Sequence, residues 1–184
     1  IMAGLVGSEM CIRDSHNQDN NKRTIANAAA IVQNGDVRGI YHKSFLPNYS
    51  VFDEARYFSK GTEPNTLFWY DDIAIGINIC EDIWIEDGPA EEQVKQGASL
   101  IININASPYD IYKSETRKEI VMKKALKLNV PIIYLNMVGG QDELVFDGGS
   151  FVVNDLGEII YQASSFKEEV FHLDIDLKLS LIHI

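Results

Sequence analysis

Residues 73–84 read Ile-Ala-Ile-Gly-Ile-Asn-Ile-Cys-Glu-Asp-Ile-Trp, an almost unbroken apolar run that stops at a cysteine and two acids. A run of this kind predicts a strand in a sheet whose face is covered. Leu100–Asn105 and Pro131–Asn136 repeat the pattern, and Ser114–Leu128 between them places apolar residues at helical spacing. Strands alternating with helices indicate an α/β layer structure.

Hairpins are predicted towards both ends of the chain. Asn34-Gly35 is a strong two-residue turn signal, and it joins a predicted strand over Ala26–Gln33 to one over Val37–Lys43. Phe45–Gly61 holds several turn residues and is expected to be a loop. The remaining expected elements are a helix over 89–96, a loop that begins at 139–140, and strands over 66–70, 150–153, 158–162 and 170–175. The sheet is therefore expected to be mixed.

Composition narrows the class of protein. The chain has 184 residues, of which 46% are hydrophobic and 23% charged, a globular composition for one domain. Two cysteines exclude a disulfide framework and a four-cysteine zinc module. The net charge of −11 argues against a nucleic-acid partner, and no apolar run approaches the ~20 residues of a membrane span. A cytoplasmic domain with neither a nucleic-acid nor a membrane partner is expected.

The two ends of the chain have a different origin from the rest. Leu5–Ser15 and Leu179–Ile184 match translations of a sequencing-library adapter and of its reverse complement. A weak signal peptide is the alternative for the N-terminus, but residues 1–15 contain no continuous apolar core. We therefore expect residues 1–15 and 179–184 to be adapter-derived, and residues 16–178 to be a natural domain fragment.

Cys80 is the candidate nucleophile that the residues alone suggest. It ends a predicted buried strand, and the turn after it supplies backbone N–H groups for a thiolate or an oxyanion. A buried structural cysteine fits the same position, so the residues leave both roles open. For Lys43, at the end of its strand, the residue by itself favours a solvated lysine over a catalytic one.

The sequence offers no pattern for a metal or a nucleotide. His42 and His172 lie in predicted strands without a catalytic signature beside them. A group of acids lacks the glycine and the alternating oxygen ligands of a calcium loop, and is expected to form a solvated acidic turn. These acids are Glu81, Asp82, Glu86 and Asp87. Neither glycine-rich phosphate-binding motif occurs. No metal is therefore expected.

Four sequence blocks, in order, resemble the nitrilase superfamily of carbon–nitrogen hydrolases, and most of all its glutamine-dependent NAD⁺ synthetases. The blocks are Tyr41–Phe58, Gly76–Trp84, Asn105–Tyr109 and Asn136–Gly149. The resemblance covers residues 22–175. It implies a nitrilase-like α-β-β-α sandwich, which we expect to be incomplete at the N-terminus.

The resemblance also implies a Glu-Lys-Cys triad. Cys80 is then the nucleophile that attacks the side-chain carbonyl of glutamine, and Lys43 stabilises the oxyanion with help from the Glu81 N–H. Glu54 matches an auxiliary glutamate that orients Lys43. The general-base glutamate of the family lies on a segment upstream of His16, so we expect this chain to hydrolyse glutamine poorly or not at all.

Substrate contacts follow from the same resemblance, which suggests that Tyr49, Glu81 and Ser107 contact glutamine. A carboxylate such as Glu81 can bind the α-ammonium of an amino acid, and hydroxyls can hold its carboxylate. Trp84 and Phe52 either line the pocket or belong to the core, and the sequence leaves both open.

The function implied is a glutaminase that supplies ammonia to a C-terminal synthetase domain following residue 178. ATP and deamido-NAD would belong to that domain, so no cofactor is expected in this one, and the intact protein is expected to be a homo-oligomer. A free-standing amidase or carbamoylase is the alternative enzyme. An interaction module that has lost its activity is the alternative without catalysis.

Overall fold

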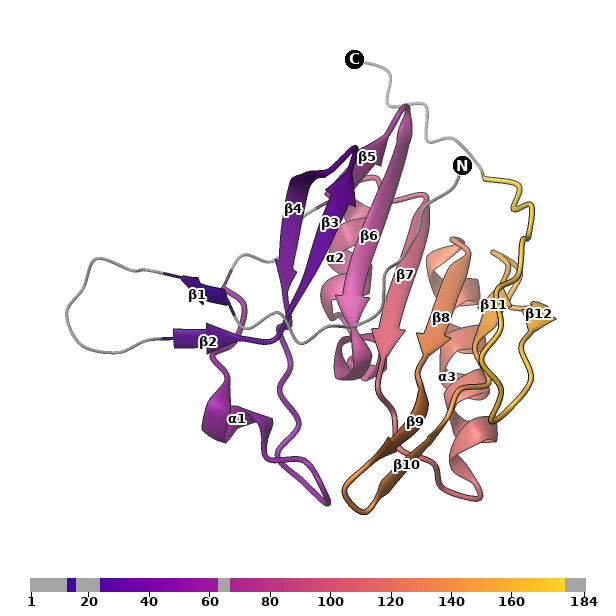
Figure 1. Ribbon diagram of the computed structural model, residues 1–184. Helices are drawn as coiled ribbons and strands as arrows, with labels where there is room; N and C mark the ends of the chain where they lie inside the picture. Colours follow the sequence, from indigo (N-terminus) through magenta and orange to yellow (C-terminus); the bar gives the residue numbers. More distant parts are fainter. Residues whose placement is uncertain (1–12, 16–23, 63–66, 178–184) are drawn as a thin grey trace.

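The computed structural model describes residues 13–15, 24–62 and 67–177, and it shows a central sheet with two longer helices on one face (Figure 1). The elements in chain order are β1 (Arg13–Ser15), β2 (Thr24–Ala26), β3 (Ala28–Gln33), β4 (Asp36–His42), α1 (Glu54–Tyr57), β5 (Leu67–Tyr70), β6 (Ile73–Ile79), the 3₁₀ turn η1 (Cys80–Trp84), α2 (Pro89–Lys95), β7 (Leu100–Asn105), α3 (Lys113–Leu128), β8 (Ile132–Asn136), β9 (Val138–Gln141), β10 (Leu144–Asp147), β11 (Phe151–Val153) and β12 (Ile159–Gln162).

The main sheet has six strands in the order β12-β11-β8-β7-β6-β5. Its three middle strands, β6, β7 and β8, are parallel, and the strands on either side pair antiparallel. The middle strands are the three apolar runs of the sequence, because both of their faces are covered. The prediction of a mixed sheet is confirmed.

The two faces of this sheet carry different partners. On one face, Ile101 and Ile132 pack with Val121 and Ala125 of α3 and with Ala90 of α2. On the other face, Ile77, Leu100 and Ile102 pack against Ala29 and Ile31 of β3. The β3–β4 hairpin thus forms a second sheet layer, and the described layers run helix, sheet, sheet.

The turn of the β3–β4 hairpin forms at the residues where the sequence predicts it. Asn34 and Gly35 both have positive φ, 54° and 83°, as the tight turn between β3 and β4 requires. The predicted strand over Ala26–Gln33 is interrupted at Asn27, whose carbonyl accepts a hydrogen bond from the Lys43 N–H at 2.8 Å. β2 and β3 are therefore separate strands.

The carboxyl ends of β6, β7 and β8 point to the same edge of the sheet, and α1 and the β9–β10 hairpin lie beyond that edge (Figure 1). Ligand sites in sheets of parallel strands form at this edge. Cys80, Ala106 and Met137 follow the three strands there. The fold thus collects the sequence blocks at one end.

Three local predictions were wrong. The expected loop at 45–61 contains the single turn α1, and the expected loop after 139–140 is the β9–β10 hairpin, in which Gly139 has φ of 154°. Residues 170–175 form no strand, although their apolar residues alternate. Val170 is 90% exposed, because no strand among the described residues covers it.

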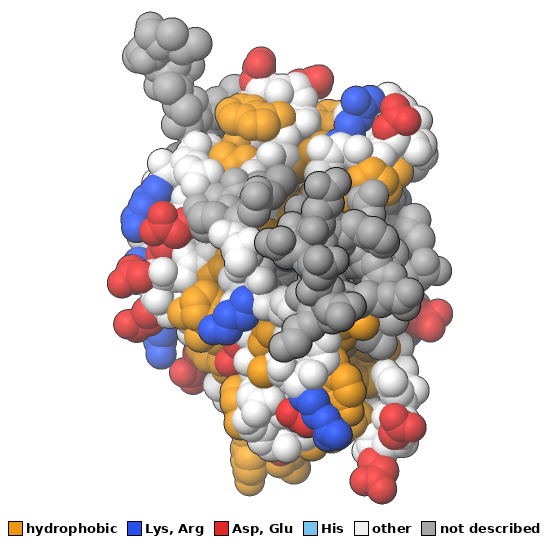
Figure 2. Space-filling view, turned by 90° about the vertical axis from the view of Figure 1, so that its left-hand side faces the viewer, with side chains coloured by type: hydrophobic (Ala, Val, Ile, Leu, Met, Phe, Trp, Pro, Cys, Tyr) orange, Lys and Arg blue, Asp and Glu red, His pale blue; other side chains and the backbone are white. Residues whose placement is uncertain are grey.

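Arg13–Ser15 pair antiparallel with β2 and are the described part of the segment attributed to the adapter. The rest of residues 1–15, and residues 179–184, lie outside the described residues. On the face turned towards the viewer in Figure 2, the described acidic and basic side chains are interspersed. No helix in the described part of the chain has the length and apolar character of a membrane span.

Candidate active site

Lys43 follows β4 and is held in place through its backbone and its side chain. Its N–H donates to the Asn27 carbonyl at 2.8 Å, and its carbonyl accepts from the Gly61 N–H at 2.9 Å. The side chain is 1% exposed, and its ammonium donates to Glu54 Oε1 at 2.7 Å and Oε2 at 2.8 Å. Glu54 opens α1, so this short helix in the loop delivers the carboxylate that neutralises a buried cation.

Cys80 occupies a strained turn at the end of β6. It is a free, partly buried cysteine with φ of 46°, a left-handed conformation that is rare for residues other than glycine. Strained backbone of this kind clusters at functional sites. The turn into η1 therefore presents the thiol at the carboxyl edge of the sheet.

The Cys80 thiol titrates high. Burial raises its pKa to about 11, the nearby Lys43 ammonium acts in the opposite direction, and Glu54 and Glu81 raise the pKa further. Desolvation disfavours the thiolate, and a neighbouring cation favours it. Lys43 and Cys80 are thus electrostatically coupled, and the thiol needs a base to ionise at neutral pH.

Asp82 lies two residues after Cys80 and is fully buried. Its Oδ2 accepts from the Tyr41 hydroxyl at 2.7 Å and from the Ile79 N–H at 3.0 Å. Its Oδ1 accepts from the backbone N–H groups of Phe45 and Ser44, at 2.9 and 3.2 Å. Burial raises the pKa of Asp82, and the hydrogen bonds from Ile79, Tyr41 and Phe45 oppose that rise.

A chain of buried amides lies beneath the turn. Gln93 of α2 accepts from Asn78 Nδ2 at 3.3 Å, Asn78 Oδ1 accepts from Asn103 at 2.8 Å, and Asn103 Oδ1 accepts from Asn105 at 2.7 Å. Asn103 also donates to the Cys80 carbonyl at 3.5 Å. The amides hydrogen-bond to one another inside the sheet and support the backbone of Cys80, although Asn105 Oδ1 at the end of the chain of amides has no partner among the described residues.

A buried ion pair fixes the loops after β7 and β10. Arg117 of α3 donates to Asp147 Oδ1 at 2.8 Å and to the carbonyls of Ser107 and Pro108 at 2.9 and 2.8 Å. Its Nε donates to the Ser107 hydroxyl at 3.2 Å. Asn136 Oδ1 accepts from the Ser107 N–H at 2.9 Å. Ser107 is 3% exposed, so both its backbone and its hydroxyl belong to this network.

Tyr49 and Glu81 meet on the outer side of the site. The Tyr49 hydroxyl donates to Glu81, with both carboxylate oxygens at 2.9 Å, and burial with the Glu81 carboxylate raises the pKa of this phenol to about 12. The Tyr49 ring contacts Phe52 edge-on, and the Lys113 ammonium lies 5.8 Å from the centre of the Phe52 ring. Tyr49 remains 56% exposed, so solvent reaches this pair.

A family model described as Carbon-nitrogen hydrolase matches residues 1–180. The chain belongs to the carbon–nitrogen hydrolase family. The matched range takes in residues 1–15, whose attribution to an adapter stays a prediction.

Individual relatives agree with this family. The glutamine-dependent NAD(+) synthetase of Thermotoga maritima is 48% identical over 152 residues, which cover 82% of this chain and 26% of that protein. The structure of glutamine-dependent NAD⁺ synthetase from Acinetobacter baumannii, in complex with ADP, matches with a TM-score of 0.76 at 43% identity, over 80% of this chain and 28% of that chain. This carbon–nitrogen hydrolase thus spans less than a third of the length of the curated relatives it matches.

A structural neighbour within the family supports the fold. The crystal structure of carbon-nitrogen hydrolase from Helicobacter pylori matches with a TM-score of 0.74, over 82% of this chain and 57% of that chain. At 24% identity, this match bears on the fold alone. Together with the layers described above, the matches confirm the predicted nitrilase-like sandwich.

The predicted residues of this carbon–nitrogen hydrolase divide into two groups. Lys43, Glu54 and Cys80 come together through the ion pair and the electrostatic coupling, and Tyr49 contacts Glu81. Ser107 makes its described hydrogen bonds with Arg117 and Asn136, and none with Lys43, Glu54 or Cys80. Of the two roles left open for Trp84, the structure shows core packing, since this ring lies against the helix-side core.

Asp82 was predicted to belong to a solvated acidic turn, and that prediction was wrong. The fold buries the carboxylate because backbone N–H groups from two segments need an acceptor there. One signal was available: an acid at the third position of a turn can cap the N–H before it, as Asp82 does for Ile79. Arg117 had no such signal, because its partners are distant in the sequence.

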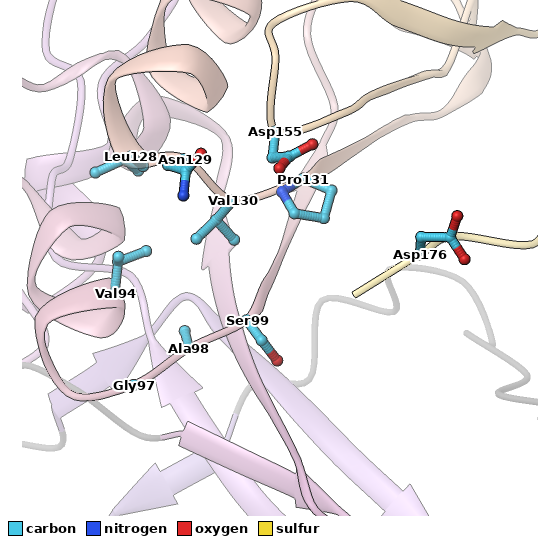
Figure 3. A pocket seen from close by; sticks show the side chains of 10 residues that line it. All are labelled: Val94, Gly97, Ala98, Ser99, Leu128, Asn129, Val130, Pro131, Asp155 and Asp176. Atoms are coloured by element: carbon cyan, nitrogen blue, oxygen red, sulfur yellow. The ribbon is translucent and has the colours of Figure 1, made fainter. Parts of the chain in front are cut away.

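A pocket of about 240 Å³ lies elsewhere. Figure 3 shows its lining, with Val94 of α2, Ser99 before β7, Pro131 before β8 and Asp155 after β11. These positions mark the amino ends of β7 and β8, the opposite edge of the sheet from Cys80. Within residues 13–15, 24–62 and 67–177, no three His, Cys, Asp or Glu side chains gather as a metal site.

Proposed function

We propose that this chain is the glutamine-hydrolysing part of a glutamine-dependent NAD⁺ synthetase. The observation that carries the proposal is the buried Lys43 ammonium, which is neutralised by Glu54 and coupled to the Cys80 thiol on a strained turn. The identity of 48% to such a synthetase over most of this chain favours this branch of the family over a free-standing amidase or carbamoylase, and over an interaction module.

The first half of the reaction transfers the acyl group to sulfur. A base takes the Cys80 proton, Sγ bonds to the side-chain carbonyl carbon of glutamine, and the carbonyl π electrons move onto oxygen. The Lys43 ammonium and the Glu81 N–H stabilise this oxyanion. When the oxyanion collapses, the C–N bond breaks and the nitrogen takes up the proton that the base had removed. Ammonia then departs, and the acyl group remains on Cys80 as a thioester.

The second half consumes water. A water molecule loses its proton to the same base and attacks the thioester carbon. The C–S bond then breaks, the sulfur regains a proton, and glutamate leaves. The Cys80 pKa of about 11 explains why a base is required, since the thiol keeps its proton at neutral pH. The family resemblance assigns this role to a further glutamate on an N-terminal segment. Glu54 is already engaged with Lys43.

Recognition of the amino acid is assigned to the outer side of the site. Glu81, oriented by the Tyr49 hydroxyl, would bind the α-ammonium of glutamine by a charge-assisted hydrogen bond. Ser107 would reach the substrate through its hydroxyl, whose oxygen already accepts one hydrogen bond from Arg117. Its place among the glutamine contacts remains part of the proposal.

In the intact protein, the ammonia would pass to a C-terminal synthetase domain that binds ATP and deamido-NAD, so this domain would hold no cofactor. Relatives that carry this segment as about a quarter of their length support such a further domain. A cytoplasmic location is proposed for the whole enzyme, in line with the two cysteines of the chain. A homo-oligomeric state is proposed from the family resemblance.

The proposal is tested by covalent labelling with the glutamine-mimicking diazoketone 6-diazo-5-oxo-L-norleucine. In a Cys11→Ala background, labelling is followed by intact mass and by peptide mapping. We expect one adduct on Cys80, protection by glutamine and no adduct in Cys80→Ser. Glu81→Gln should slow the labelling, whereas Glu86→Gln, a matched change at an exposed acid of the same segment, should not.

Two outcomes would overturn the proposal. Absence of an adduct on Cys80 would contradict the proposal that this chain hydrolyses glutamine. Equal protection by glutamine, asparagine and butyramide would instead favour a free-standing amidase, because a simple amide lacks the α-ammonium that Glu81 is proposed to bind.

A further inference from the structure

The Asp82 carboxylate joins two segments that the proposed chemistry needs side by side. Its four hydrogen-bond donors flank the two proposed catalytic residues. Ile79 precedes Cys80, Tyr41 stands two residues before Lys43, and Ser44 and Phe45 follow it. Among the described residues, every hydrogen bond between segments 41–45 and 79–84 ends on this carboxylate.

Only an ionised carboxylate meets these four donors. Each of its oxygens has two acceptor sites, and each receives two donors. An amide would turn its NH₂ group towards at least one backbone N–H, which leaves two donors facing each other. A buried charge that lacks its hydrogen bonds is costly, so the carboxylate and its donors keep one another in place.

The position of the Lys43 ammonium depends on the same segment. Glu54 holds the end of the side chain, but the backbone on both sides of Lys43 is tied to the turn through Asp82. A loss of these bonds would let the end of β4 move relative to η1, and the ammonium would move relative to the sulfur.

We propose that Asp82 is a positioning residue, which fixes the Lys43 ammonium against the Cys80 sulfur by bridging the end of β4 to the nucleophile turn. Asp82 touches neither glutamine nor the sulfur in this role and acts through the two segments it joins. The inference rests on the proposed function for its catalytic meaning, but the geometry on which it acts can be measured without glutamine.

The test is a double-mutant cycle on the reaction of Cys80 with iodoacetamide, in a Cys11→Ala background. Lys43→Met should slow alkylation at pH 8 by about tenfold, since one pKa unit corresponds to a tenfold change in thiolate. In an Asp82→Asn background, the same Lys43→Met change should slow it less than about twofold. The cycle compares the effect of Lys43→Met on the alkylation rate in the two backgrounds. The direct effect of the lost Asp82 charge on that rate is present in both Asp82→Asn proteins and therefore cancels.

The matched control is Glu91→Gln. Glu91, on α2, is another buried carboxylate that caps a backbone N–H, that of Gly88, and it pairs with Lys124 of α3 at 2.6 Å. None of its described hydrogen bonds reaches segment 41–45. This variant should lose stability while the full tenfold effect of Lys43→Met remains. Asp82→Glu, which keeps the charge, should recover part of the coupling.

An equal effect of Lys43→Met in the wild-type and Asp82→Asn backgrounds would overturn the inference and leave Asp82 with a structural role only. If Asp82→Asn does not fold, Tyr41→Phe removes the shortest of the four bonds and keeps the carboxylate. An unchanged Lys43 effect in Tyr41→Phe then counts against the inference. Equal protection by glutamine, asparagine and butyramide in the labelling experiment would overturn the proposed function, but the result of this cycle would still be interpretable.

Discussion

The Lys43 ammonium lies 2.7 and 2.8 Å from the two oxygens of Glu54, and the lysine side chain is only 1% exposed. Glu54 therefore has two effects on the site. It holds the cation that favours the Cys80 thiolate, and its own charge disfavours that thiolate. The balance between these effects determines how readily Cys80 ionises.

The Cys80 thiol should react only with assistance or at high pH. With a pKa of about 11, its rate of alkylation by iodoacetamide should rise about tenfold per pH unit from pH 7 to pH 10 and level off above pH 11. This pH–rate profile is measured on the Cys11→Ala variant. The reaction is stopped at set times, and the extent of alkylation is determined by mass spectrometry. A plateau that begins below pH 8 would show that Lys43 outweighs burial.

Removing the Glu54 charge should lower the Cys80 pKa. Glu54→Gln keeps the side-chain shape and removes an anion that raises this pKa, so alkylation at pH 8 should become several-fold faster, up to about tenfold for one unit. Glu119→Gln, the same charge change on an exposed site of α3, is the control. Slower alkylation in Glu54→Gln would mean that the hold on Lys43 matters more than the charge.

The pair Arg117–Asp147 should dominate the stability of the loops at this edge. Both side chains are under 5% exposed, so Asp147→Ala leaves an unpaired guanidinium in the interior and should cost about 3–5 kcal/mol of unfolding free energy. Urea denaturation gives this value. Glu119→Ala breaks an exposed ion pair with Lys123 and should stay within about 0.5 kcal/mol. Similar losses in both variants would contradict this account.

The sequence predicted the layers of the fold because periodicity reports burial. The apolar runs at 73–79 and 100–105 are strands covered on both faces, and Asn34-Gly35 forms its turn. The same signal failed at 170–175, where alternation without a partner strand leaves Val170 exposed. At 138–141, two glycines led to the prediction of a loop, whereas these residues form a strand.

The site was predictable only in part, because its contacts are long-range. Lys43 gained its role from the family resemblance. The strand end and the turn made Cys80 a candidate nucleophile, but they fit a buried structural cysteine as well, and the resemblance decided between the two roles. The position of Asp82 in its turn indicated a cap on Ile79 but not burial, since its burial depends on Tyr41, Ser44 and Phe45, about 40 residues earlier. Local propensity carries no information about such partners.

Gly76, in the middle of β6, should tolerate no side chain, because α2 packs directly on the strand there. A Cβ at this position would lie 2.6 Å from Gln93 Oε1 and 2.6 Å from Ile101 Cδ1, and both side chains are fully buried. Gln93 cannot retreat freely, since it donates to the Ile77 carbonyl at 2.8 Å and accepts from Asn78. Gly76→Ala should therefore cost about 1–3 kcal/mol, the usual range for overpacking.

In Gly140→Ala, the nearest atom to the new Cβ is the Leu144 carbonyl oxygen at 3.6 Å, so stability should change by less than about 0.5 kcal/mol. Urea denaturation of the two variants beside the wild type decides the matter, and a Gly76→Ala protein as stable as Gly140→Ala would show that α2 moves away from the strand at little cost.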